Sequence, residues 1–124
     1  MKKYEMQIRK DTLVNSRTAL AMHELRIYIL GSFWYDNLGG LHTEENGCHA
    51  PGYMCGCPTL LECIQYLSNE MSIAFKPRKQ ERGYKVVAQR GKHIFYNSKK
   101  EDKFFATLEE ALEVAAQECL NDLY

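Results

Sequence analysis

The sequence predicts a single α+β domain, in which helices pack on one face of an antiparallel sheet of three to four strands. The chain has 124 residues, 45% of them apolar and 26% charged, so it can bury one core and has no room for a second domain. Two capping boxes, at Thr59 and Thr107, each open an amphipathic helical repeat. Short apolar runs lie between these helices, as strands would. The expected order over residues 1–124 is β-α-loop-α-β-β-β-α.

The first strand and the first helix are predicted from alternation and capping. Apolar and polar side chains alternate over residues 3–10, which is typical of a strand with one wet face. Asn15 or Ser16 can cap a helix, whose apolar repeat continues to about Asn37. The β-branched and aromatic run over residues 27–35 also suits a strand, so this stretch leaves two alternatives.

The central helix is predicted to begin after Thr59. Thr59 and Glu62 have the spacing at which each side chain satisfies the other's backbone donor. The apolar side chains then recur at helical intervals, and they form one core stripe: Leu60, Ile64, Leu67 and Met71.

Three strands and a last helix complete the predicted fold. The strands cover residues 72–75, 84–89 and 93–96, and Arg90-Gly91 is the expected hairpin connection. The last helix begins near Thr107. Its inward face is expected to be Leu108, Leu112, Ala115, Cys119 and Leu123, and its outward face Glu110, Glu113 and Gln117.

A zero net charge excludes a protein coated with basic charge, yet the charges are segregated. Residues 76–103 hold ten basic and three acidic side chains, whereas residues 104–124 hold five acidic and no basic ones. The segment 76–103 therefore predicts a contact surface for phosphates or for an acidic protein; a solvated strand face neutralised by the last helix is the alternative. The expected partner-binding residues are Lys76, Arg78, Lys79, Arg82, Lys85, Arg90 and Lys92.

Consecutive aromatic residues suggest a second part of that surface. Phe33, Trp34 and Tyr35 cannot all face one core if they lie on a helix, so Trp34 and Tyr35 are expected to anchor a protein contact. Alternatively, the loop over residues 39–58 folds back over them.

The second half resembles the double-stranded RNA-binding domain. The resemblance consists of an α-β-β-β-α order with Ser98-Lys99-Lys100-Glu101 before an alanine-bearing helix. It implies that lysines at the start of the last helix hold phosphates. The sequence departs from that family, because the capping box places Lys99 and Lys100 in a loop before the helix.

A loop rich in Gly, Cys and His, residues 39–58, suggests a metal site. Cys48, His49, Cys55 and Cys57 are candidate ligands for a structural zinc ion, which takes four thiolate or imidazole ligands. Redox-active thiols, or an ordered loop with free cysteines, are the alternatives. No cofactor is otherwise required.

Catalytic and targeting motifs do not stand out. The sequence has no phosphate loop, nucleotide fingerprint or Ser/His/Asp arrangement, so we expect no enzyme activity. The two N-terminal lysines are not followed by an apolar core, and no apolar stretch is long enough to span a bilayer, so no membrane association is expected. Five cysteines, an odd number, suit a reducing compartment, and we expect a cytoplasmic protein.

These observations predict a small intracellular binding protein that acts by protein–protein contact, with a homodimer as one arrangement. In size and style the chain resembles accessory or inhibitor proteins of phages and other mobile elements. The first alternative is a nucleic-acid-binding module that uses residues 76–103, and the second is a protein with structural zinc in the Cys/His loop.

Overall fold

The structure, a computed structural model, describes residues 12–27, 33–42, 53–99 and 103–123. The strand expected over residues 3–10 lies outside them. The described elements, in chain order, are α2 (Ser16–Glu24), β1 (Trp34–Asp36), β2 (Leu41–His42), β3 (Tyr53–Gly56), α3 (Leu60–Glu70), β4 (Ala74–Gln80), β5 (Gly83–Arg90), β6 (His93–Asn97) and α4 (Leu108–Leu123).

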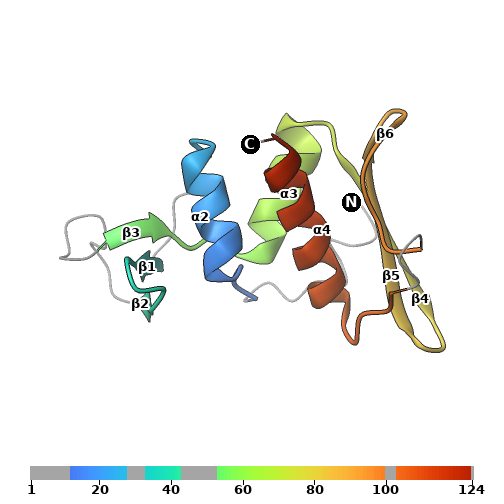
Figure 1. Cartoon of the computed structure of the whole chain (residues 1–124), viewed down its shortest axis with the longest axis horizontal. Helices are drawn as coiled ribbons and strands as arrows, with labels where there is room; N and C mark the ends of the chain where they lie inside the picture. Colours follow the sequence, from blue (N-terminus) through green and yellow to red (C-terminus); the bar gives the residue numbers. More distant parts are fainter. Residues whose placement is uncertain (1–11, 28–32, 43–52, 100–102, 124) are drawn as a thin grey trace.

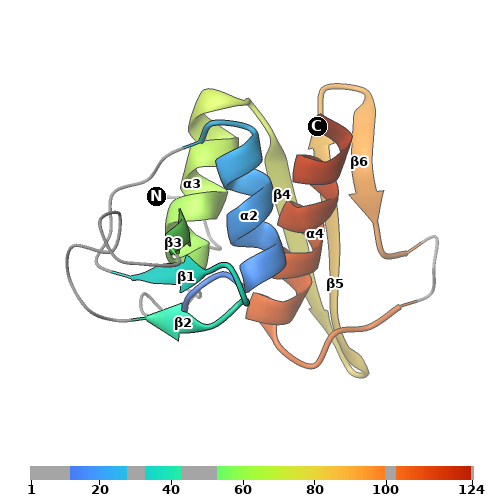
Figure 2. The same ribbon diagram turned by 60° about the vertical axis from the view of Figure 1, so that its left-hand side comes forward.

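The predicted α+β class is confirmed, but the strands are divided between two antiparallel sheets. One sheet has the order β2-β1-β3 and the other the order β4-β5-β6. Figure 1 shows the small sheet at one end of the molecule and the larger sheet at the other, with the helices between them. α3 and α4 cover one face of the larger sheet, and Figure 2 shows α4 lying against that face.

The first helix is much shorter than the 15–37 expectation, which is wrong at its C-terminal end. Asn15 caps α2 by accepting a hydrogen bond from the Thr18 N–H, as predicted. The helix ends at Glu24 because Arg26 adopts a left-handed φ of 61°. The Ile27 N–H then bonds back to the Met22 carbonyl at 2.9 Å, which closes the helix end. The strand alternative over residues 27–35 is correct for Trp34 and Tyr35, and the strand continues to Asp36.

The core lies between the helices and the inner face of the larger sheet. The predicted capping box of Thr59 and Glu62 is present, and Leu60, Ile64 and Leu67 are buried as expected. The predicted inward residues of α4 are also buried, except for Leu123, which is half-buried. The sheet contributes Phe75, Val86, Ala88 and Tyr96 to this core.

The strands of the larger sheet extend beyond the predicted runs. β4 and β5 pair from Ala74↔Gln89 to Gln80↔Gly83. Arg90 pairs with His93, so the turn between β5 and β6 is Gly91-Lys92, one residue later than expected. Gly91 has a φ of 58°, which this tight turn requires.

Glu113 was predicted to lie on the outward face of α4, but its carboxylate does not face solvent. One of its carboxylate oxygens accepts a hydrogen bond from the Asn15 N–H at 2.6 Å, and the other is buried without a hydrogen-bond partner in the described structure. Burial raises the pKa of this carboxyl, although the hydrogen bond from Asn15 lowers it in part. The contact joins the N-terminus of α2 to α4.

We expect Glu113→Gln to raise the free energy of unfolding at neutral pH. A raised native pKa means that Glu113 favours folding when protonated and that this contribution is lost as the pH rises through the native pKa. Glutamine keeps the acceptor for Asn15 and removes the buried charge. Denaturant titrations should therefore show a gain that shrinks to zero below the ordinary glutamate pKa. Glu118→Gln, an exposed change on α4, serves as the control; equal pH profiles for the wild type and Glu113→Gln would contradict this assignment.

Candidate binding surface

The outer face of the larger sheet, which no described helix covers, gathers basic side chains from three segments. Residues paired across antiparallel strands share a face, and the pairs Lys76↔Val87 and Arg78↔Lys85 put both strands' basic residues on one side. Lys99, two residues after β6, joins them. A shallow pocket of about 90 Å³ lies there, with no acidic residue in its lining: Lys76, Arg78, Lys85, Val86, Val87, Gln89 and Lys99. We call these residues the basic pocket.

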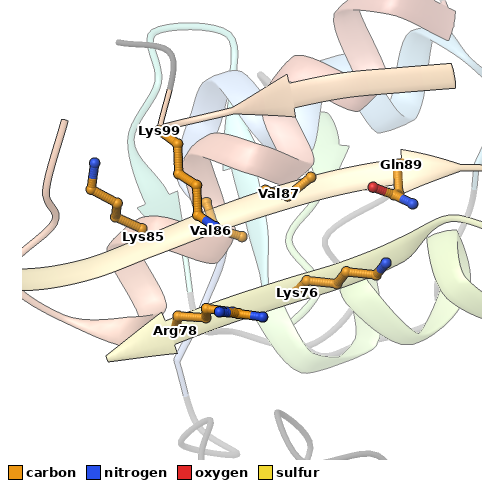
Figure 3. A pocket seen from close by; sticks show the side chains of 7 residues that line it. All are labelled: Lys76, Arg78, Lys85, Val86, Val87, Gln89 and Lys99. Atoms are coloured by element: carbon orange, nitrogen blue, oxygen red, sulfur yellow. The ribbon is translucent and has the colours of Figure 1, made fainter. Parts of the chain in front are cut away.

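Three exposed cations line the basic pocket. In Figure 3 the Lys99 side chain extends onto β5 beside Val86, and Arg78 lies along the neighbouring strand β4. The Lys76 ammonium points toward the end of the pocket at which the Gln89 amide lies. Lys76, Arg78 and Lys99 are exposed, so their charges are presented to a ligand rather than held inside the fold.

Lys85 differs from the other three cations because it is buried. Its prediction as a partner-binding residue is therefore wrong. Only 8% of Lys85 is exposed, and its ammonium lies 4.4 Å from the centre of the Phe104 ring. Figure 3 shows the amine directed away from the other cations. Arg82, in the β4–β5 turn, lies over the same ring at 5.0 Å. Phe104 therefore fixes two positive charges beside the pocket, a role that the sequence analysis did not assign.

The remaining predicted basic residues lie elsewhere. Lys79 pairs with Tyr84, so the strand alternation places it on the helix side of the sheet. Arg90 donates a hydrogen bond to the Met71 carbonyl at 3.3 Å and covers Phe95, also away from the pocket. Lys92 is in the turn at the far end of the hairpin. The basic segment thus divides into a pocket group and a dispersed group.

Trp34 and Tyr35 are not surface anchors, which overturns that part of the prediction. Both lie on β1, and only 4% and 9% of these residues are exposed. The Tyr35 hydroxyl donates to the Val14 carbonyl at 2.7 Å, and the Trp34 ring stacks on His42 at 4.0 Å. The alternative was correct in outline, because β2 and β3 of segment 39–58 flank β1. Both residues are at the opposite end of the molecule from the basic pocket (Figure 1).

The zinc prediction gains no support from the two candidate ligands that can be located. Cys48 and His49 lie outside the described residues. Cys55 and Cys57 are buried on or beside β3, and burial raises the pKa of the Cys57 thiol to about 11, away from the thiolate that zinc takes. Over the described ranges, no three His, Cys, Asp or Glu side chains are grouped so that they could hold a metal ion.

Ser98 positions Lys99. This role was not predicted because an isolated serine belongs to no recognisable sequence motif. Ser98 is fully buried at the end of β6. Its hydroxyl accepts a hydrogen bond from the Val86 N–H at 2.8 Å and donates one to the Val86 carbonyl at 3.1 Å. The side chain thus continues the β5–β6 pairing beyond the last residue of the strand, and Lys99 follows directly over the pocket.

A second polar cluster organises the small sheet. Asp36 accepts hydrogen bonds from the Leu38 and Gly40 N–H groups at 2.9 and 2.8 Å, and its other oxygen lies 2.8 Å from His42 Nε2. The His42 contact is the largest cause of a lowered Asp36 pKa, and the two backbone hydrogen bonds add to it. The cluster closes the β1–β2 turn.

We expect Asp36→Ala to open this turn and to change the fluorescence of Trp34, the single tryptophan of the chain. The alanine removes the acceptors of two backbone donors and the partner of His42, on which Trp34 stacks. Because the native pKa of Asp36 is lowered, its contribution is present at neutral pH and is lost as the pH falls through that pKa. The wild type should therefore approach the mutant emission only in acid. Asp122→Asn, beside the exposed His93, is the control, and an unchanged emission in Asp36→Ala would refute the role.

The resemblance to the double-stranded RNA-binding domain holds for element order but not for the lysines. The segment α3-β4-β5-β6-α4 has that order. However, α4 begins at Leu108 with Glu109 and Glu110 in its first turn, and Lys99 lies nine positions earlier, over the outer face of the sheet. Lys100 is outside the described residues. The phosphate grip that the resemblance implies at the start of the helix is therefore replaced by acidic side chains.

Comparison with known proteins does not assign the chain to a family. No protein-family model matches it, and neither a curated protein nor a solved structure does. Among the described helices, none combines the length and the apolar character that crossing a membrane would take.

Proposed function

We propose that the protein is a non-enzymatic binding protein that captures an acidic protein partner with the outer face of its larger sheet. The observation that carries the proposal is the basic pocket, which is lined by Lys76, Arg78 and Lys99 and by no acidic residue. Such a surface attracts a partner of opposite charge and repels wrong ones. The cytoplasmic location and the accessory or inhibitor role belong to the same proposal.

The face of the sheet is a better contact surface than its β4 edge. Val86 directs both of its backbone groups to Ser98, on the β6 side. Val86 is paired with Pro77 on β4, and the two residues exchange no backbone hydrogen bonds. The backbone nitrogen of Pro77 therefore faces the outer edge of β4. An incoming strand would find no donor there. This supports recognition by side chains rather than by strand addition.

The composition of the face favours a protein over a nucleic acid. Ile94, 45% exposed, shares the outer face because it pairs with Gln89, and Val87 lines the pocket. Apolar side chains beside charges are typical of protein interfaces. The pocket lining contains no aromatic ring on which a base could stack. The capture experiment described next also tests the nucleic-acid alternative.

Affinity capture with two charge-reversal variants tests the proposal. Lys76→Glu/Arg78→Glu reverses the pocket, and Lys79→Glu/Lys92→Glu makes the same change in net charge on dispersed exposed residues. From a nuclease-treated lysate, the wild type and the Lys79/Lys92 variant should retain the same protein, while the pocket variant retains at least about tenfold less, equivalent to about 1.4 kcal/mol. Equal losses in both variants would show a net-charge effect and reject the surface. Capture that disappears on nuclease treatment would favour the nucleic-acid alternative.

A further inference from the structure

We propose that the basic pocket binds a phosphate monoester carried by a side chain of the protein partner. The inference rests on the proposed function and names the chemical group that the surface recognises. It follows from the charge, the geometry and the size of the pocket.

The charge of the pocket exceeds what a single carboxylate would neutralise. Lys76 and Arg78 come from β4 and Lys99 from the segment after β6, so the fold brings together cations that are far apart in sequence. A phosphate monoester carries close to two negative charges at neutral pH. A dianion therefore gains more from three cations that line one pocket than a carboxylate or a phosphodiester, which carry one charge each.

The kinds of donors in the pocket also fit a phosphate. The Arg78 guanidinium offers a planar fork for two phosphate oxygens, and the lysines act as mobile point charges. Lys99 lies on the other side of the pocket from Arg78, and Lys76 and the Gln89 amide lie on its third side (Figure 3). Donors around three sides suit a tetrahedral group with several acceptor oxygens.

The size of the pocket selects a terminal group. A volume of about 90 Å³ accommodates a compact anion such as a phosphate group. The pocket is shallow, so the group can be presented on the surface of a folded partner. Phe104 holds Lys85 and Arg82 next to the pocket, which extends the positive potential toward neighbouring acidic residues of that partner.

Titration of the full chain with O-phosphoserine tests the inference. Backbone amide signals of Val87, Gln89 and Lys99 should shift and saturate, at constant ionic strength. Dimethyl phosphate, a monoanionic diester, and succinate, a dicarboxylate, should bind at least about tenfold more weakly. Lys76→Gln/Arg78→Gln should weaken phosphoserine binding by a similar factor, whereas Lys79→Gln/Lys92→Gln, the matched control, should leave it unchanged.

The inference would be overturned by the absence of a saturable shift with phosphoserine, by equal binding of dimethyl phosphate or succinate, or by equal weakening in both double variants. A duplex RNA that displaces phosphoserine and binds more tightly would also overturn it. Failure of the proposed function is distinguishable. If Lys76→Glu/Arg78→Glu abolishes capture of a protein but phosphoserine does not bind, the surface stands and the phosphate assignment is wrong. If the phosphate assignment is correct, phosphatase treatment of the lysate should abolish capture of the protein partner.

Discussion

Gly83→Ala is expected to destabilise the fold by about 2–5 kcal/mol through backbone strain and steric overlap, a large part of the 5–15 kcal/mol of a typical domain. Gly83 pairs with Gln80 at the start of β5 and has a φ of 134°, a backbone conformation that side chains rarely adopt. A Cβ atom there would lie 2.5 Å from the Phe105 carbonyl oxygen. That carbonyl accepts the Tyr84 N–H at 2.8 Å, and the Phe105 N–H bonds back to Tyr84 at 2.9 Å. The substitution must therefore strain the turn or break this bridge.

Urea titration followed by circular dichroism measures the loss. Gly91→Asn is the matched control, because Gly91 also has a positive φ, of 58°, but nothing lies within 4 Å of its added Cβ. Asparagine tolerates this left-handed conformation, so the control should change stability by less than about 1 kcal/mol. Equal stabilities of the two variants would show that the close approach of Phe105 does not constrain the fold.

Ser98→Ala is expected to cost about 1–3 kcal/mol and to disturb the basic pocket. The alanine removes the acceptor of the buried Val86 N–H, which then has no partner, and it frees the end of β6 that positions Lys99. Amide hydrogen exchange should accelerate at Val86, and denaturant titration should record the lost stability. Ser16→Ala, at the half-buried start of α2, should change stability by less than about 0.5 kcal/mol. A Val86 amide that exchanges at the wild-type rate would contradict the role of Ser98.

Local sequence signals predicted the helices with caps and the strand pattern of the second half. Thr59 with Glu62 satisfies a helix end within four residues, so its consequence is visible without any tertiary contact. The predicted length of the first helix was wrong because the helix end depends on the left-handed conformation of Arg26. No residue type in that stretch indicates this conformation. The aromatic run was then free to pair with β2 and β3, a non-local choice.

The candidate surface was only half predictable for the same reason. The charge count identified segment 76–103, but pairing and alternation decided which side of the sheet each cation occupies. Lys76 and Arg78 are two residues apart and share a face, whereas Lys79 falls on the other. The position of Lys99 depends on the hydrogen bonds between Ser98 and Val86, and that of the Lys85 amine on its contact with Phe104; both contacts join residues distant in sequence.

Lysine footprinting of the protein with its captured partner tests the central claim most directly. Acetylation followed by mass spectrometry compares the free chain with the complex, at four lysines that are all exposed in the structure: Lys76, Lys79, Lys92 and Lys99. If the outer face of the larger sheet is the contact surface, Lys76 and Lys99 should be protected several-fold in the complex while Lys79 and Lys92 react as in the free chain. Protection of Lys79 or Lys92 with unchanged labelling of Lys76 and Lys99 would contradict it.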